Sequence, residues 1–463
     1  MSEKRRFTQL EIYDFGPFKE AKIELAPLTI FIGKNALGKS MLLYLIWTLE
    51  STIPNIRKLQ ETLDKELNMS KVVERIFEEE IDGELLKKLL MEHLRFLPMV
   101  WAEELKETLH GAFGVKPNEL IHSETDETKI LIKGENCEME VSIRRDDISA
   151  RWLTLDENFI KDNISIDMKE KNLTITLKDY IPYERYISHP LDITGSLIGF
   201  MQGVVYDLFG GICGATPGLE TLLVDGRAGI TRTLLTTYPG IGLTIRDILR
   251  ADYHFVDSLY KLASDYLNGK IDLEAPALKS LLRELNCKPI IEEEFGIPRI
   301  YVEALGKRIP LEKSPSGVRE VIPLLLGLLS ERTSILYVEE PETHLHPGAV
   351  ILLPRLMGYA INMLGKDLRL TTHSDLFIMA VNNLIALSSN PEGAKELGYS
   401  EEELIEPDMV RAYLLKKADD HVEVVELPVM EDGFDESAFE EVAEELFRER
   451  SEVMRLLEEK KSR

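Results

Sequence analysis

The 463-residue sequence predicts an α/β fold with a parallel sheet at its centre. Two observations carry this prediction. An apolar run over residues 29–32 leads through a glycine-containing turn into a helical run over residues 41–47. Further along, apolar runs over residues 334–338 and 368–372 lie on either side of another helical segment. Strand, helix and strand in that order are typical of a parallel sheet with helical connections.

The turn after the first strand has the pattern G-x-x-x-x-G-K-S, formed by Gly33, Lys34, Asn35, Ala36, Leu37, Gly38, Lys39 and Ser40. Its glycines allow the main chain to wrap around an anion, and the amides at the start of the following helix point at the bound phosphate. Lys39 would neutralise the β- and γ-phosphates, and the Ser40 hydroxyl would ligate Mg²⁺. The pattern therefore predicts a site for a nucleoside triphosphate, with ATP and Mg²⁺ as cofactors.

Acidic and imidazole side chains follow the two later strands. The strand that ends at Val338 leads into Glu339 and Glu340, and the strand that ends at Thr372 leads into His373. Because the carboxyl ends of parallel strands meet at one edge of a sheet, we expect these side chains beside the phosphates. One carboxylate would complete the Mg²⁺ shell, and its neighbour would polarise water.

Simpler interpretations stand beside these. Glu339 and Glu340 also suit the N-terminus of a helix, where carboxylates are favoured without any chemistry. An isolated histidine such as His373 is often a buried, hydrogen-bonded residue. Glu342 and two nearby histidines imitate a zinc site, but a third ligand is not evident. The glycine-lysine turn upstream favours the nucleotide interpretation over each of them.

The charge balance limits contact with nucleic acid. The formal net charge is −26, so the average surface repels phosphate, and a nucleic-acid contact would need a local basic patch or an assembly interface. The compact basic clusters are residues 4–6 and the pair Arg144 and Arg145, which are more simply interpreted as solvated surface.

Cysteine usage and hydropathy point to the cytoplasm. The three cysteines, Cys137, Cys213 and Cys287, have spacings that fit neither paired disulfides nor a zinc ribbon, which suits a reducing compartment. The most apolar stretch, residues 196–215, is interrupted by polar residues and glycines, so we expect buried core and no membrane span.

The chain order predicts four segments. Residues 1–50 form the first part of the α/β unit, and 51–195 form an insertion of amphipathic helices, over about 55–109, and an antiparallel sheet, over about 129–180. Residues 196–430 form the remainder of the unit, with an exposed turn at 225–229. Residues 431–463 form a C-terminal helix that packs on the core.

These ordered motifs resemble the ABC-class ATPases of the SMC and DNA-repair type. The additional element is a serine and glycine turn, Ser316 and Gly317, that opens a helix between the insertion and the carboxylate strand. The likeness is greatest to the OLD-like, AAA_15/AAA_21-like group of ATPases, whose strand ends in E-E-P-E-x-H-L-H-P as residues 339–347 do. It covers about the first 50 residues and roughly 220–460, without a recognisable Toprim nuclease domain.

The resemblance implies a fold and a set of roles. The fold is a P-loop NTPase, an ABC-type ATPase head with a mixed α and β insertion. Its sites form between two heads, so that Ser316 and Gly317 act on the nucleotide of the other head; either Ser316 or Pro315 can occupy the serine position of that signature turn. Glu339 corresponds to the Mg²⁺-shell residue, Glu340 to the catalytic carboxylate and His373 to the catalytic switch histidine. His344 and His346 would contact the opposite head.

The function expected from this resemblance is an ATP-hydrolysing conformational switch. Nucleotide would join two copies head to head, and the motion would pass to a separate effector protein, with nucleic acid possible and no membrane, in anti-phage defence or DNA maintenance. Two alternatives remain open. One is the nucleotide-binding subunit of a transporter, and the other is a nucleotide-gated scaffold with negligible turnover.

Overall fold

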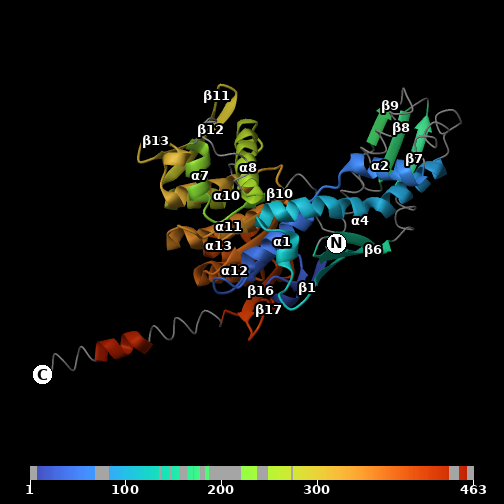
Figure 1. Cartoon of the computed structure of the whole chain (residues 1–463). Coiled ribbons are helices and arrows are strands. Elements are labelled where there is room, and N and C mark those ends of the chain that lie inside the picture. The colour runs from blue at the N-terminus through green and yellow to red at the C-terminus, as the bar shows by residue number, and fades with distance from the viewer. Residues whose placement is uncertain are drawn as a thin grey trace.

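The computed structural model describes residues 8–67, 83–134, 137–145, 147–155, 164–169, 172–177, 183–186, 220–236, 249–272, 275–436 and 448–455 (Figure 1). The clusters at 4–6 and the apolar stretch at 196–215, with Cys213, lie outside these residues. Cys137 and Cys287 are free thiols, and both are buried.

The centre of the molecule is a six-stranded sheet with the order β10-β14-β15-β3-β16-β17. Its members are β10 (Glu220–Leu223), β14 (Ile335–Glu339), β15 (Asp367–Thr372), β3 (Leu28–Ile32), β16 (Val410–Lys417) and β17 (Val422–Leu427). All pairings except that of β16 with β17 are parallel. Every residue of β3 and β14 is buried, as expected for apolar strands covered on both faces. The predicted parallel α/β core is therefore confirmed.

Helices from distant parts of the sequence pack around this sheet (Figure 1). They are α1 (Lys39–Ser51), α7 (Arg227–Thr236), α8 (Arg250–Leu267), α9 (Pro276–Glu284), α10 (Ser316–Leu329), α11 (Pro347–Leu364), α12 (Asp375–Ser388) and α13 (Pro391–Glu396). By length and composition α11 is the one helix among the described residues that could cross a membrane, and half of its apolar window is buried inside the fold.

A second, antiparallel sheet combines the N-terminus with the insertion. Its order is β2-β1-β4-β5-β6, from β1 (Gln9–Phe15), β2 (Phe18–Glu24), β4 (Glu127–Lys133), β5 (Cys137–Arg144) and β6 (Ile148–Leu155). It joins the central sheet where the Val422 amide donates to the Pro17 carbonyl, at 2.8 Å. The first strands therefore form one sheet with residues 127–155, although more than 100 residues separate them in the sequence.

Helices are found where the sequence predicts them, over about 55–109. In the described part of this region they are α2 (Ile56–Leu67) and the 31-residue α4 (Gly83–Phe113), which continues through Pro98. It holds because Leu94, Leu97, Trp101, Leu105 and Leu109 form one buried stripe at helical spacing.

The β region divides between two sheets, because residues 164–186 form a separate sheet of β7 (Ile164–Lys169), β8 (Asn172–Leu177) and β9 (Tyr183–Tyr186). A further three-stranded sheet contains β11 (Cys287–Glu294), β12 (Ile297–Ala304) and β13 (Lys307–Pro310). At the C-terminus, residues 448–455 are helical and exposed on all sides, including Val453 at 39%. In this described part the expected packing on the core is not found.

A buried charged network ties α1 to the central sheet. The Tyr337 hydroxyl donates to Glu50, and the Arg369 Nη2 lies 3.8 Å from the Glu50 Oε1. The Arg369 Nη1 also donates to the Ala26 carbonyl, at 2.7 Å. Burial raises the pKa of Glu50 from 4.5 to about 7, against the opposing effects of Arg369 and Tyr337.

Glu50→Gln should flatten the pH dependence of stability between about pH 5 and 8. A carboxyl whose pKa is raised in the folded state stabilises the fold fully below its unfolded pKa of 4.5, and this contribution is lost as the pH rises through about 7. The size is a few kcal/mol, at about 1.4 kcal/mol per unit of pKa. Urea unfolding at several pH values compares the two proteins; parallel pH profiles would contradict this account of Glu50.

Candidate functional site

The glycine-lysine turn forms a wrapped loop between β3 and α1. Gly33, Ala36 and Gly38 have φ values of 149°, 64° and 89°, so the loop repeatedly uses left-handed backbone. A Cβ on Gly38 would lie 2.7 Å from the Phe18 ring, and one on Gly33 would lie 2.9 Å from the Leu415 carbonyl oxygen. The glycines are therefore required by both conformation and space, as a main-chain cradle for an anion needs.

Lys39 holds its ammonium group at this loop. The Nζ donates to the carbonyls of Gly33, at 2.8 Å, and Lys34, at 3.1 Å. Burial lowers the pKa of Lys39, while the carboxylates of Glu340 and Glu342 act in the opposite direction. The cation is thus placed between the loop and the acidic end of β14. Ser40 follows it in the first turn of α1 and is exposed.

The sheet register brings the predicted residues to one edge. On neighbouring strands Thr372 is paired with Ile32, and Thr371 is paired with Glu339. One residue further along, the chain reaches His373 after β15 and Gly33 after β3. The glycine loop, the carboxylates and the histidine therefore lie at the carboxyl ends of three adjacent parallel strands, where α/β sheets bind ligands.

Glu339 is buried and its carboxylate is oriented by two donors. The Tyr44 hydroxyl donates to its Oε2 at 2.7 Å, and the Asp225 amide donates to the same oxygen at 2.8 Å. Burial, followed by the charge of Glu339, raises the pKa of Tyr44, so this hydroxyl keeps its proton for donation. The carboxylate is held in one orientation at the end of β14, as a metal-shell ligand requires.

Glu340 has a strained backbone and faces His373. Its φ is +43°, and its amide donates to the Thr371 carbonyl at 3.0 Å. The His373 Nδ1 lies 3.1 Å from the Glu340 Oε1. Glu342 supports this histidine from below, because its Oε1 accepts from the Thr372 hydroxyl, at 2.6 Å, and from the His373 amide, at 3.2 Å. Burial raises the pKa of Glu342.

The serine and glycine turn starts α10 beside the loop that follows β14. Pro315 is the N-cap, and Ser316 and Gly317 are the first helical residues, so their amides have no acceptor within the helix. A Cβ on Gly317 would lie 2.6 Å from the carbonyl oxygen of His344 in the same chain. Ser316 is exposed. Among the alternatives for the signature serine, only Ser316 lies on the helix itself.

The two loop histidines have different environments. His344 is in the left-handed region, with φ of 59°. His346 is the N-cap of α11, and its Nδ1 accepts from the Gly348 amide at 3.3 Å and lies 3.4 Å from the Glu284 Oε1. Within the described residues, no three His, Cys, Asp or Glu side chains cluster as a metal site. The residues present fit Mg²⁺, which proteins commonly hold through one or two carboxylates and the phosphates of a nucleotide.

The expected exposed turn at 225–229 is confirmed only for Asp225 and Gly226, because Arg227 and Ala228 are buried and helical. Arg227 is fully buried in the first turn of α7, where its guanidinium donates to main-chain carbonyls of β10, β14 and α10. No local pattern predicts this burial, because an arginine between glycines in a polar segment resembles a surface residue. Local sequence patterns also do not reveal Tyr44 and Asp225, which each donate one hydrogen bond to Glu339, or Glu320, which contacts Arg227 and Ala228.

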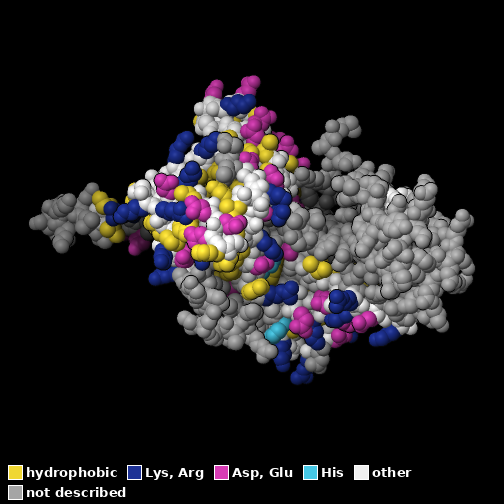
Figure 2. All heavy atoms as spheres, turned by 90° about the horizontal axis from the view of Figure 1, so that it is seen from above, with side chains coloured by type: hydrophobic (Ala, Val, Ile, Leu, Met, Phe, Trp, Pro, Cys, Tyr) yellow, Lys and Arg dark blue, Asp and Glu magenta, His cyan; other side chains and the backbone are white. Residues whose placement is uncertain are grey.

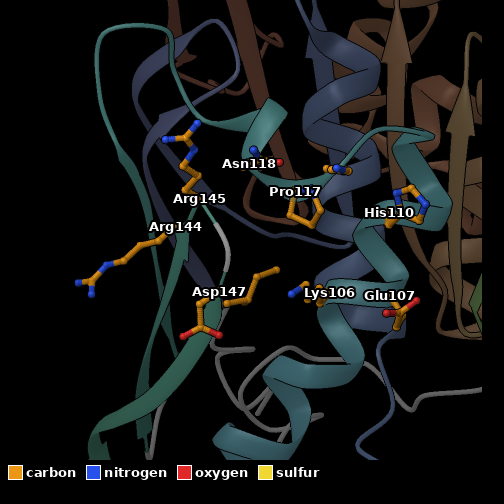
Figure 3. A pocket seen from close by; sticks show the side chains of 10 residues that line it. Lys106, Glu107, His110, Pro117, Asn118, Arg144, Arg145 and Asp147 are labelled. Carbon is orange, nitrogen blue, oxygen red and sulfur yellow. The ribbon is translucent and has the colours of Figure 1, made fainter.

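The basic pair Arg144 and Arg145 lies away from this edge. It lines a cavity of about 340 Å³ between α4 and the turn of β5 and β6, together with Lys106, Lys116 and Asp147 (Figure 3). Arg144 points outward and is paired with Glu127, 3.0 Å from its Oε1. On the described surface drawn in Figure 2, basic and acidic side chains are interspersed, without a continuous basic patch.

Comparison with solved structures finds SMC head domains. The chain is 11% identical to an SMC head bound to the C-terminal winged-helix domain of ScpA, with 92% and 98% of the two chains covered and a TM-score of 0.40. A Thermotoga maritima SMC head domain is also 11% identical, with 91% and 99% covered and a TM-score of 0.35. An SMC head domain with an extended coiled coil, bound to the C-terminal domain of ScpA and derived from Pyrococcus furiosus, is also 11% identical. This match covers 95% of the present chain and 99% of the other, with a TM-score of 0.37. No curated protein matches the chain.

Two family models match the two sides of the site. The model described as "AAA ATPase domain" matches residues 6–194, which contain the glycine-lysine loop. The model described as "AAA domain, putative AbiEii toxin, Type IV TA system" matches residues 254–380, which contain Ser316, Gly317, the β14 carboxylates and His373. These two matches support the AAA_15/AAA_21-like ATPase that the ordered motifs predicted, and the parallel sheet with its glycine-lysine loop is the α/β fold predicted for it.

Proposed function

We propose that the chain is an ATP-binding and ATP-hydrolysing conformational switch whose heads associate on nucleotide. The observation that supports this most is the register of β3, β15 and β14, which brings Lys39, Glu340 and His373 to one sheet edge. Each of these residues comes from a different segment. The main chain at or beside Lys39 and Glu340 has positive φ angles, and the amide of His373 donates a hydrogen bond to Glu342. A structural turn with a surface lysine would need none of this.

In the proposed mechanism the loop of residues 33–40 binds the phosphates of ATP through main-chain amides and the Lys39 ammonium. Ser40 and Glu339 would hold Mg²⁺, which supplies charge neutralisation at the phosphates. Glu340 would orient and polarise water, and His373, 3.1 Å from its carboxylate, would hold that carboxylate toward the γ-phosphate position. The amides of Ser316 and Gly317 would complete the site of a second copy, because both lie at an exposed helix start.

The biological setting follows from the resemblance to SMC and OLD-like ATPases. We propose that the closing and opening of two heads acts on a separate effector protein in the cytoplasm, in anti-phage defence or DNA maintenance. Nucleic acid would bind through an assembled surface, because the single chain carries a net charge of −26.

Lys39→Ala should weaken ATP binding by about 10- to 100-fold, because a hydrogen bond to a charged group contributes about 1.5–3 kcal/mol. Titration with a fluorescent ATP analogue measures the dissociation constant. Lys395→Ala, which removes an exposed lysine on α13, is the matched control and should bind like the wild type. Equal affinity of the folded Lys39→Ala variant would contradict the loop assignment.

Glu340→Gln should keep ATP binding and lower kcat by about 10²- to 10⁴-fold, as expected when a positioned base is lost. Phosphate release measures turnover, and size-exclusion chromatography measures the ATP-bound assemblies that should accumulate. If Glu339→Gln binds ATP without cleaving it while Glu340→Gln turns over normally, the two roles are reversed. Tight binding with negligible wild-type turnover would instead support the nucleotide-gated scaffold.

Ser316→Glu should abolish ATP-dependent head association while one head still binds ATP, because it places a negative charge where amides would meet the γ-phosphate. It is preferable to a substitution at Gly317, where any side chain collides with His344 of the same chain. Ser389→Glu, the same change at the exposed far end of α12, is the control.

Mixing Ser316→Glu with Lys39→Ala tests assembly in trans. A mixed dimer has one site with both defects and one site with neither, so turnover should partly recover. No recovery under conditions shown to form mixed dimers would contradict a site shared between heads.

A further inference from the structure

Arg227 holds the main chain that carries both predicted active carboxylates. Its Nη1 donates to the Glu339 carbonyl at 2.7 Å, and its Nη2 donates to the Glu340 carbonyl at 3.3 Å. The same Nη1 contacts the carbonyls of Leu223, at 3.2 Å, and Val224, at 3.0 Å, at the end of β10. The side chain of Arg227 is 0% exposed, so its guanidinium donates hydrogen bonds only to groups of the protein.

These contacts act where the backbone is strained. A positive φ in a residue with a side chain, such as Glu340 at +43°, costs of order 1–3 kcal/mol and persists only when surrounding contacts determine it. Arg227 bonds to the carbonyls on both sides of the Glu340 Cα, and the Thr371 carbonyl accepts from the Glu340 amide. The strained turn in turn directs the Glu340 carboxylate to His373.

Residues 225–228, which contain Arg227, also orient the Glu339 carboxylate and contact α10. The Asp225 amide donates to the Glu339 carboxylate, and the Ala228 amide donates to the Glu320 Oε1 at 2.9 Å. The Glu320 Oε2 forms an ion pair with the Arg227 Nε at 3.0 Å, while the Nε proton is directed to the Glu320 carbonyl, at 3.3 Å. Glu320 lies one helical turn after Ser316, on the helix whose exposed start faces a second head in the proposed function.

We propose that Arg227 is a positioning residue for the carboxylates of Glu339 and Glu340, and that its ion pair with Glu320 makes the metal-binding geometry depend on the position of α10. This inference rests on the ATP-binding function proposed above. It gives residues 225–228 a regulatory role, because a displacement of α10 by a second head would reach the end of β14 through the buried contacts of Glu320 with Arg227 and Ala228.

The experiment measures metal binding separately from turnover. Mn²⁺, as a probe for Mg²⁺, is titrated by electron paramagnetic resonance into the full chain saturated with a non-hydrolysable ATP analogue. Glu320→Gln removes the negative charge of the ion pair with Arg227 and keeps the size of the side chain. It should weaken Mn²⁺ binding by about 10- to 100-fold, the usual effect of losing a residue that orients metal ligands. Affinity for the nucleotide without metal should stay within about twofold of wild type, because the 33–40 loop is untouched.

A matched control separates this role from stability alone. Arg355, which is 17% exposed, and the buried Glu403 form another arginine–glutamate pair, at 2.7 Å, between α11 and the segment after α13. Glu403→Gln also leaves a largely buried arginine without its partner charge, and should lower the thermal unfolding midpoint without changing Mn²⁺ affinity. Arg227→Met combined with Glu320→Leu leaves no unpaired charge but removes the hydrogen bonds to the Glu339 and Glu340 carbonyls, so it should also bind Mn²⁺ about 10- to 100-fold more weakly than the wild type.

Each outcome is decisive. Wild-type Mn²⁺ affinity in folded Glu320→Gln and in the double variant would overturn the proposal. A loss in the double variant with none in Glu320→Gln would leave Arg227 as a positioning residue and overturn its link to α10. An equal loss in Glu403→Gln would reduce the effect to general destabilisation. Failure of the wild type itself to bind nucleotide and Mn²⁺ would instead be a failure of the proposed function.

Discussion

The parallel pairing of β14, β15 and β3 is the constraint on which the rest of the site depends. Because Glu339 is level with Thr371, and Thr372 with Ile32, three loops that are distant in sequence must leave the sheet side by side. A shift of one residue in any of these pairings would turn the side chains to opposite faces. Every residue of β3 and β14 is buried, so the polar edge stands at the end of an apolar core.

Buried cations then organise the main chain around this edge. Arg227 donates hydrogen bonds to carbonyls at the ends of β10 and β14. Arg369 donates to the Ala26 carbonyl before β3 and lies near Glu50 of α1. The Lys366 ammonium donates to the carbonyls of Ser330 and Thr333. Each of these cations has lost its hydration, and hydrogen bonds to main-chain oxygens offset that cost. The two arginines also lie beside a carboxylate. Such groups stabilise one particular arrangement of strands and loops, because another arrangement would leave a buried charge unpaired.

The parts of the site that could be predicted from the sequence are those in which the functional residues directly follow a strand or form part of a local turn. The loop of residues 33–40 requires glycines at left-handed positions, and Glu339, Glu340 and His373 follow apolar strands directly. The fold of the insertion was less predictable. Whether Pro98 breaks a helix depends on the tertiary partners of the α4 stripe, and whether residues 164–186 join the sheet of β4 depends on contacts distant in sequence. The burial of Arg227 is not predictable from the sequence, because its acceptors are mainly main-chain oxygens, which no side-chain pattern reveals.

The most direct test of the ATP-site assignment is an experimental structure of the chain with Mg²⁺ and a non-hydrolysable ATP analogue. It should show the β- and γ-phosphates in the loop of residues 33–40, the metal beside Ser40 and Glu339, and the amides of Ser316 and Gly317 from a second copy at the γ-phosphate. Phosphates bound away from this loop, or a fully enclosed nucleotide within a single chain, would contradict the account.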